Sequence, residues 1–413
     1  MVEDLSRHGH RQVPWGESAD LLVINSCAVT GTASQKTRQA VRQARRRQPH
    51  AYLVLMGCDA TVDRGAWEQE GPDLVLPHPL NRPLSEMLPE SLNVGEGVSV
   101  AVAGEATEGF SLPGIALDAE RTRANLKIQD GCNFRCSYCV IPSVRGPARS
   151  RDCQDVLREA HELVERGIRE LVLCGVNVTT YANGGLDLAG LAQRVLEMPG
   201  DFRVRIGSAE PGPAIESVVE LMAWEPRLCR FLHLPLQYGE DTILRRMRRH
   251  YTTVQYAEMV REAARRVPGI CLGCDVIVGF PGETEEQFQA CREFLAGLPL
   301  SLIHVFPFSP RPGTPAASMP GRPAGRVVAA RVDELLALAQ QKAEAFAKSQ
   351  IGCTLPLLVE EGSPPSGWSD NYLHITLPEA CECSRNTLVT ARILSAIGGR
   401  ELQGEPVFPS GRR

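Results

Sequence analysis

The sequence contains no apolar run approaching the roughly 18 residues that a membrane-spanning helix requires. Its first residues, MVEDLSRHGHRQ, also have no apolar core of the kind found in secretory signal peptides. These absences predict a cytoplasmic protein that does not enter a membrane. The 413 residues are 43% hydrophobic and 23% charged, which is typical of a globular protein with two or three domains and excludes a disordered or fibrous chain.

Lysine is scarce, whereas cysteine is plentiful. Four lysines leave 40 of the 44 basic residues as arginine, which suits phosphate and base contacts but also arises from codon bias in a GC-rich genome. The formal net charge of -5 argues against nucleic-acid binding by the whole surface. Fourteen cysteines in a chain of this length without an export signal are expected as thiolates or buried side chains, which favours metal or iron–sulfur chemistry over disulfides.

The segment 21–58 has the pattern strand, helix, strand. LLVINSC and YLVLMGC are apolar runs on either side of the polar, helix-forming ASQKTRQAVRQARRRQP. The strands of a βαβ unit are parallel, so Cys27 and Cys58, each closing a strand, are expected at the same sheet edge, where α/β proteins bind ligands. Packing in a buried sheet also explains an isolated pair of cysteines.

A Pro- and Gly-rich stretch follows, with weak strand signals and no strong helical period, and it leads to a domain junction expected near residue 120. Beyond it, six apolar strands alternate with helical patterns. This alternation predicts an open (β/α)6 partial barrel with its active face at the carboxyl ends of the strands. The expected strands are 125–129, 170–175, 203–207, 231–236, 272–280 and 302–308, and the expected helices are 153–166, 187–198, 213–224, 239–248, 254–266 and 284–297.

A long Ala-rich helix is expected over 325–350. After it come short strand-like runs typical of a small β-barrel, with turns expected at GSPPSGWSDN and GG. The sequence therefore predicts an α/β protein of three domains: a partial doubly wound βαβ domain over 1–118, the partial barrel over 119–348 and a small β-barrel over 349–413.

Cys132, Cys136 and Cys139 form a C-x3-C-x2-C loop just after the expected strand 125–129. Three close thiols on one loop can wrap a single metal centre. Structural zinc sites and ordinary iron–sulfur sites take four protein ligands, so this loop leaves one position open unless a distant residue fills it. From spacing alone, a zinc loop completed by a remote ligand and chance clustering remain alternatives.

The segment GCNFRCSYCVIPSVRGPARSR resembles the cluster loop of radical S-adenosylmethionine (SAM) enzymes, and specifically that of the methylthiotransferase family. Further segments agree with that family in the same order along nearly the whole chain: INSCAVT, LMGC, HLPLQYG, LRRMRRHYT, DVIVGFPGETEEQF and HVFPFSPRPGTPA. The combination of IQDGCNF, MRRHYT and HVFPFSPRPGTPA is most similar to the MtaB-like branch, which modifies threonylcarbamoyladenosine in tRNA. GWSDNY is similar to the family's TRAM domain, a small RNA-binding β-barrel.

The resemblance implies that Cys132, Cys136 and Cys139 hold a 4Fe–4S cluster whose open iron binds SAM. An electron from a donor such as flavodoxin or ferredoxin would release a 5′-deoxyadenosyl radical from SAM, and this radical would abstract hydrogen from C2 of the adenine. A second, auxiliary 4Fe–4S cluster on the N-terminal domain would supply the sulfur, which another SAM methylates. The sequence does not identify the donor that replaces this sulfur.

Cys27 and Cys58 match two of the three cysteines that the family uses for the auxiliary cluster, and residues 1–20 contain no counterpart of the first. Either the start has been placed too late, or the auxiliary cluster is defective or differently ligated. We expect the former, because a doubly wound domain that lacks its first strand exposes an unpaired central edge.

By the same resemblance, six residues are expected near SAM or between the clusters: Asn177, Ser208, Glu210, Gln237, Val278 and Gly279. Gly279 begins a tight strand-to-helix turn, and the acidic residues of 283–285 favour a helix N-terminus, so capping alone also explains that segment. Cys271 and Cys274 have the spacing of a ligand pair but are expected on opposite faces of one strand, as core residues.

Two basic segments, 35–48 and 245–249, can neutralise tRNA phosphates or form solvated helix faces. The TRAM-like unit is not strongly basic, so it would bind RNA through few contacts such as Trp368 and Tyr372. The leading expectation is methylthiolation of C2 of threonylcarbamoyladenosine next to the anticodon of tRNA. The alternatives are the same chemistry on isopentenyladenosine or on a ribosomal-protein aspartate, and a non-catalytic, colourless zinc protein that binds RNA.

Overall fold

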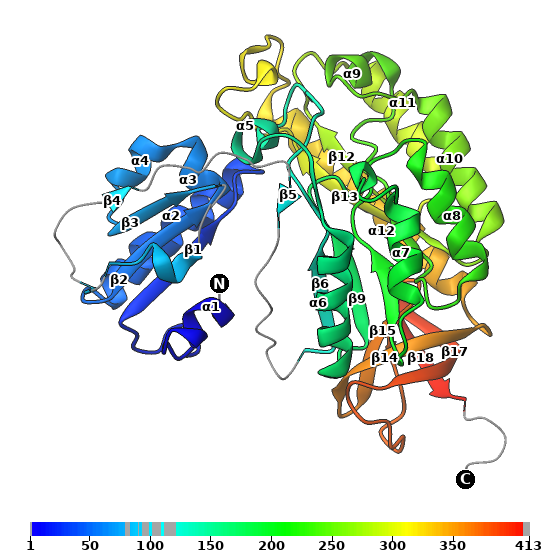
Figure 1. Cartoon of the computed structure of the whole chain (residues 1–413). Coiled ribbons are helices and arrows are strands. Elements are labelled where there is room, and N and C mark those ends of the chain that lie inside the picture. Colours follow the sequence, from blue (N-terminus) through cyan, green and yellow to red (C-terminus); the bar gives the residue numbers. More distant parts are fainter. Residues whose placement is uncertain are drawn as a thin grey trace. The chain divides into compact units, whose positions relative to one another are not determined.

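The computed structural model describes residues 2–78, 83–89, 91–92, 99–100, 109–110 and 121–407 (Figure 1). The chain forms two compact units. The first comprises Met1–Ala116, Asp130–Arg149 and Ser309–Ser318, and the second Leu117–Gln129, Ser150–Phe308 and Met319–Arg413. The junction expected near residue 120 falls outside the described residues, and the three-domain partition stays a prediction. Within the described ranges, no helix is both long enough and apolar enough to cross a membrane.

A parallel sheet in the order β1-β2-β3-β4 forms the centre of the first unit. Its strands are β1 (Leu21–Ser26), β2 (Tyr52–Gly57), β3 (Leu74–Pro77) and β4 (Ser99–Val100). The helices of this unit are α1 (Val2–Arg7), α2 (Gly31–Arg47), α3 (Cys58–Val62), α4 (Arg64–Glu68), the short η1 (Leu84–Glu86) and α5 (Ile141–Arg145). The helix α2 packs Val41 and Ala44 against apolar residues of β1 and β2, as the alternation of apolar and polar segments predicted.

The strand β3 was not predicted from the sequence. Its four residues, LVLP, are all buried, and they are too few and too close to proline for a strand period to show. The short helices α3 and α4 fall in the same Pro- and Gly-rich stretch and were missed for the same reason.

The second unit contains the predicted partial barrel. Two parallel sheets, β6-β9-β10 and β11-β12-β13, meet where Ser208 pairs with His233 in an isolated parallel bridge. The strands are β6 (Arg123–Lys127), β9 (Glu170–Cys174), β10 (Arg203–Ile206), β11 (Phe231–His233), β12 (Cys271–Val278) and β13 (Leu302–Pro307). Three further short strands are β5 (Gly109–Phe110), which belongs to the first unit, and β7 (Gln129–Asp130) and β8 (Arg149–Arg151), each of which contains residues of both units.

Helices alternate with these strands and cover their outer side in Figure 1. They are α6 (Cys153–Glu165), the short η2 (Val178–Thr180), α7 (Leu188–Leu196), α8 (Ala214–Trp224), α9 (Asp241–Arg246), α10 (Thr253–Arg266), α11 (Glu285–Ala296) and α12 (Gly325–Ser349), and the short η3 (Pro315–Ser318) belongs to the first unit. Thr252 and Thr284 begin α10 and α11 with complete capping boxes, which satisfy backbone donors that a helix start leaves unpaired. All six expected βα repeats are therefore present.

The last part of the second unit is a closed barrel in the order β14-β15-β16-β18-β17. Its strands are β14 (Thr354–Gly362), β15 (Pro365–Ser369), β16 (His374–Thr376), β17 (Leu388–Gly398) and β18 (Glu401–Pro406). The segment GSPPSGWSDN contains turns at 363–364 and 370–371, as expected, but β15 lies between them and was not predicted. Pro365 is tolerated there as the first residue of its strand, where no ladder hydrogen bond from its nitrogen is needed.

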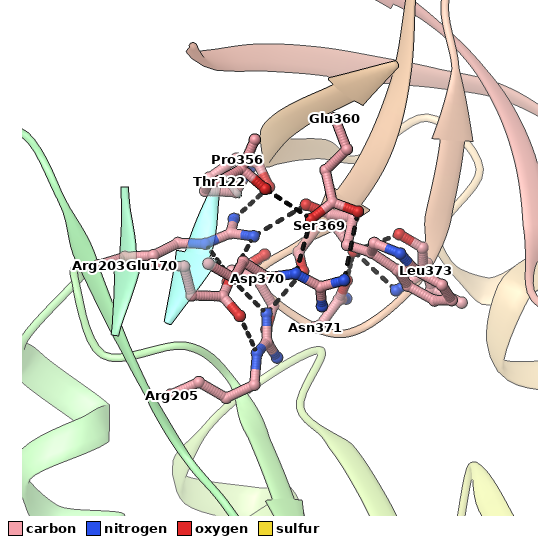
Figure 2. A network of polar contacts seen from close by, with 12 residues as sticks. Thr122, Glu170, Arg203, Arg205, Pro356, Glu360, Ser369, Asp370, Asn371 and Leu373 are labelled. Atoms are coloured by element: carbon pink, nitrogen blue, oxygen red, sulfur yellow. Dashed lines mark hydrogen bonds and ion pairs between the residues drawn. The ribbon is translucent and has the colours of Figure 1, made fainter. Parts of the chain in front are cut away.

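A buried ionic network joins the small barrel to the larger one within the second unit (Figure 2). Glu170 accepts hydrogen bonds from Arg203 and Arg205 at 2.7 and 2.8 Å, and Arg205 also donates to the Ser369 and Asp370 carbonyls. Burial alone would raise the pKa of Glu170, but the two guanidinium groups lower it to about 2. Charges buried in this way are stable only when each keeps its oppositely charged partner. The network therefore fixes how the two barrels join.

Candidate active site

The loop that carries Cys132, Cys136 and Cys139 belongs to the first compact unit and is closed by tight backbone contacts. Gly131 has φ +70°, and a Cβ there would lie 1.9 Å from the Pro147 carbonyl oxygen, so only glycine fits. The Cys132 N–H donates to the Gly146 carbonyl at 3.1 Å. Both ends of the loop are therefore held together around the thiols.

Asp130, directly before this loop, anchors it through a buried carboxylate. It forms ion pairs with Arg145 at 3.1 Å and Arg149 at 3.4 Å, and its Oδ1 accepts the Gly131 N–H at 2.9 Å. Burial alone would lower the pKa of Arg145, but the neighbouring Cys58 and Asp130 raise it. The start of the loop is thus attached to two arginines that follow it in the sequence.

The donor set of this loop fits an iron–sulfur cluster. Cys132, Cys136 and Cys139 form no disulfide, and the Phe134 backbone N–H donates to Cys132 Sγ at 3.4 Å. Thiolates with backbone N–H donors are the usual ligands of such clusters. The three residues come from one short segment, as their spacing predicted.

Cys27 and Cys58 stand at one edge of the parallel sheet. Ser26 and Gly57 are paired in register at the ends of β1 and β2, and each cysteine is the next residue along the chain. Cys27 is exposed, whereas Cys58 is buried and accepts a hydrogen bond from Arg145 Nε at 3.2 Å. Two thiols therefore reach the carboxyl edge of the sheet together.

This edge packs against the cluster loop inside the first unit. Val140 and Val144, from the end of the loop and from α5, are buried in one apolar group with Ala28 and Cys58. Arg145 joins the two thiol regions by polar contacts, because it bonds both Cys58 and Asp130. One compact unit thus brings together all five cysteines that the sequence analysis singled out as cluster ligands.

Asn177 is positioned by the end of β9 in the second unit. Its backbone N–H donates to Gln129 Oε1 at 2.8 Å, and its own Oδ1 accepts from Thr179 Oγ1 at 2.7 Å. Among the described residues, its buried Nδ2 has no hydrogen-bond partner. A buried amide donor without a partner is costly, so this atom is suited to meet a ligand oxygen.

Glu210 and Gln237 follow β10 and β11. Glu210 pairs with Arg249, and burial raises the pKa of Glu210 to about 6 although Arg249 opposes the shift. Gln237 has φ +70° and bridges to β12 by donating its N–H to the Asp275 carbonyl at 2.8 Å. Glu210 is therefore engaged with a protein cation, and Gln237 is held in an unusual backbone conformation.

Val278 and Gly279 end β12. The Val278 side chain is fully buried, and its carbonyl accepts the Phe308 N–H at 2.7 Å. Gly279 has φ +79° and donates its N–H to Glu283 Oε2 at 2.6 Å. The contacts of this turn are thus those expected of a helix N-terminus. The Val278 side chain has no exposed surface that could contact a cofactor.

Family models match most of this architecture. A model of the radical SAM superfamily matches residues 126–295, and one described as uncharacterized protein family UPF0004 matches residues 1–77. The chain is 34% identical over 405 residues to threonylcarbamoyladenosine tRNA methylthiotransferase MtaB of Bacillus subtilis (strain 168), covering 94% of this chain and 88% of that protein. The chain belongs to the radical SAM tRNA methylthiotransferases.

Other similarities agree with this membership. The methylthiotransferase is 35% identical over 358 residues to tRNA-2-methylthio-N(6)-dimethylallyladenosine synthase of Bordetella avium (strain 197N), covering 83% of this chain and 74% of that one. It matches the solved structure of the radical SAM methyltransferase TsrM from Kitasatospora setae with TM-score 0.52 and 17% identity, covering 73% of this chain and 64% of that one. The last likeness shows the fold alone.

One polar cluster of the methylthiotransferase was not predicted from the sequence. His233, Asp275 and His304 come from β11, β12 and β13, and their possible ligand atoms lie within 4.8 Å of one another. Each lies in a quoted motif, HLPLQYG, DVIVGF or HVFPF, but no spacing along the chain connects the three. Only the alignment of the strands brings them together.

The residues expected to bind RNA are partly occupied by protein contacts. In α2, Arg38 and Arg42 pair with Glu70, and Arg45 pairs with Asp73. These contacts support the view of a helix face balanced by its own acidic neighbours. The expectation that segment 35–48 binds tRNA phosphates stays a prediction.

Trp368 and Tyr372 of the small barrel stack on each other with ring centroids 4.8 Å apart. Arg400 lies over both rings, and Arg205 of the ionic network lies over Tyr372. The two aromatic side chains therefore contribute to the joint between the barrels, which the sequence analysis did not anticipate.

Proposed function

We propose that this methylthiotransferase acts on C2 of N6-threonylcarbamoyladenosine in tRNA, next to the anticodon. The observation that carries the substrate is the similarity to the Bacillus subtilis threonylcarbamoyladenosine enzyme over 94% of this chain. The Bordetella avium relative, named for dimethylallyladenosine, supports the same chemistry on another adenosine as the second candidate. With tRNA as its substrate, the enzyme is proposed to act in the cytoplasm.

In this proposal Cys132, Cys136 and Cys139 hold a 4Fe–4S cluster that binds SAM. When bound, such a cluster would supply the one-electron chemistry that activates SAM. The chain's own contribution is to hold the three thiols on a closed loop. Gly131 permits the turn, and Asp130 anchors it through Arg145 and Arg149.

Cys27 and Cys58 are proposed as ligands of the auxiliary cluster that supplies the sulfur. Their support is the paired register of Ser26 and Gly57, which places both thiols at one sheet edge. Arg145 bonds Cys58 and also Asp130, so a single side chain orients the two thiol regions relative to each other within the first unit.

SAM is proposed to lie at the carboxyl ends of the barrel strands. Asn177 is the best supported contact, because its buried Nδ2 has no partner among the described residues. Ser208, Glu210, Gln237 and Gly279 remain proposed neighbours of SAM, and any Val278 contact would be made by its backbone. Flavodoxin or ferredoxin is proposed as the electron donor.

Nucleoside mass spectrometry of tRNA tests this function. The chain is expressed in a bacterial strain that lacks its own enzyme for the modification, and the nucleosides of total tRNA are compared with those of the empty strain. We expect 2-methylthio-threonylcarbamoyladenosine to appear. Formation of 2-methylthio-isopentenyladenosine instead would transfer the substrate assignment to the second candidate.

A further inference from the structure

His233, Asp275 and His304 form a continuous row of polar side chains across three neighbouring strands of the second unit. Asp275 Oδ1 lies 3.2 Å from His233 Nε2 and 3.2 Å from His304 Nδ1. His233 Nδ1 continues the row to Ser208 Oγ at 3.0 Å. Asp275 and His304 are paired in register on β12 and β13.

The row lies on the side of the strands that faces away from the helices. Cys274, next to Asp275, is fully buried on the helical side, where Tyr256 of α10 is its hydrogen-bonding neighbour. Successive side chains of a strand point to opposite faces, so Asp275 points to the inner side of the partial barrel. Gly273 leaves the space for the imidazole, since a Cβ there would lie 3.0 Å from His233 Cδ2.

The residues beneath and above the row differ in exposure. Phe231 and Leu302 lie two residues before His233 and His304, and Cys271 lies four residues before Asp275. All three are buried in one apolar layer. Two residues later than His304, the Phe306 side chain is 40% exposed. Along the strands, the row is therefore the first polar layer after the apolar one, in the direction of the carboxyl ends.

His304 is the end of the row that a ligand can reach. Its side chain is 48% exposed, compared with 10% for His233 and 24% for Asp275. Its Nδ1 is engaged with Asp275, so Nε2 is the nitrogen of this half-exposed ring that is left for a ligand. The pKa of Asp275 is lowered to about 2, because the two histidines outweigh the effect of burial, so an ionised carboxylate stands behind the His304 ring.

We propose that this row is the binding site for the carboxylate of an amino-acid substituent on the target adenine, with His304 Nε2 donating to it. The inference rests on the proposed function and names the residues that select its substrate. An imidazole backed by a carboxylate is a strong donor to an anion. An isopentenyl group offers no acceptor, and burying it here would leave the row's donor unpaired, which disfavours that substrate.

The discriminating experiment compares one tRNA with and without its threonylcarbamoyl group, using the holoenzyme with its clusters reconstituted. The wild type is expected to bind the modified tRNA more tightly, and His304→Leu is expected to lose roughly 10- to 100-fold of that preference. Binding of the unmodified tRNA reports the remaining contacts. His161→Leu is the matched control, since His161 is a half-exposed histidine beside Glu165 on α6 and should keep the preference.

Asp275 acts through His304 and is a positioning residue. Asp275→Asn is expected to lower the preference by a smaller factor, and the double variant should lose no more than His304→Leu alone. The loss should appear in KM for the modified tRNA more than in kcat. Additive losses would mean that Asp275 does not act through His304, which would contradict the proposed role of the row.

Two other results would overturn the inference. His304→Leu could lower SAM affinity and leave the tRNA preference intact, which would assign the row to the cofactor. Alternatively, the wild type could retain one divalent metal ion in addition to its iron, and His304→Leu could lack that ion. This result would make the row of His233, Asp275 and His304 a metal site. Formation of 2-methylthio-isopentenyladenosine by the wild type would instead contradict the proposed function, so the two failures are distinguishable.

Discussion

Cysteines of the two compact units occupy different positions in their sheets. In the first unit, they directly follow strands or lie in a loop: Cys27, Cys58, Cys132, Cys136 and Cys139. In the second unit, burial raises the pKa of seven thiols: Cys174 and Cys229 to about 11, Cys271, Cys291 and Cys383 to about 12, Cys274 well above its ordinary value, and Cys153 by a smaller shift.

The comparison shows that the place in a strand, rather than the number of cysteines, decides their chemistry. A thiol inside packed structure loses hydration and stays protonated, so it neither attacks nor binds a metal readily. A thiol just past a strand end lies on a turn, at the edge of the sheet where several strands end. The proposed ligand thiols and the buried core thiols therefore differ in their place in the fold, although the side chain is the same.

The sharpest test of this comparison is Cys136→Ala. We expect SAM cleavage to fall to background, because the loop then has two thiols for a cluster that needs three. Production of 5′-deoxyadenosine with a chemical reductant measures the effect. Cys271→Ala is the control from the buried group and should keep cleavage, whereas wild-type cleavage by Cys136→Ala would remove that residue from the site.

Cys27→Ala separates the two regions of the first unit. SAM cleavage is expected to continue, and the 2-methylthio product should be lost, since Cys27 stands at the sheet edge and not on the loop. Both 5′-deoxyadenosine and the modified nucleoside are measured in one reaction. A normal product yield would exclude Cys27 from sulfur delivery.

Glu170→Gln tests whether the joint between the two barrels depends on buried charge. Removing the carboxylate leaves Arg203 and Arg205 buried without their partner, so the free energy of unfolding should fall by about 3–5 kcal/mol. Because the pKa of Glu170 is lowered on folding, wild-type stability should decline as pH falls from 4.5 towards about 2.

Urea denaturation at several pH values measures both effects of Glu170. The control is Glu165→Gln, whose side chain is 65% exposed and pairs only with His161 among the described ion pairs, so it should cost less than about 1 kcal/mol. Equal losses from Glu165 and Glu170 would mean that burial does not strengthen the network.

The smallest expected effect is thiol alkylation in the native state. With a pKa of about 12, roughly one Cys271 in 10,000 is a thiolate at pH 8, so iodoacetamide should label it only after unfolding. In protein free of clusters, the two exposed cysteines, Cys27 and Cys353, should react before Cys271. Peptide mass spectrometry reads the order, and rapid labelling of Cys271 would contradict the comparison.

Much of the fold followed from periodicity in the sequence. Six strands and their helices were located to within a few residues, because each repeat has a complete apolar run and a helical pattern of ordinary length. The missed strands include β3 and β15, which are short and contain proline. Such strands exist because a neighbouring strand pairs with them, and a local pattern does not record its neighbour.

For the candidate site, the sequence by itself determined the thiols. Cys132, Cys136 and Cys139 lie so close along the chain that one loop must hold them, and Cys27 and Cys58 each end an apolar run. Only the tertiary structure decided what surrounds them and what faces the barrel interior. Arg145 meets both Cys58 and Asp130, and His233, Asp275 and His304 meet only because three parallel strands align them. Contacts between distant segments depend on strand register, and register is fixed by packing of the whole sheet.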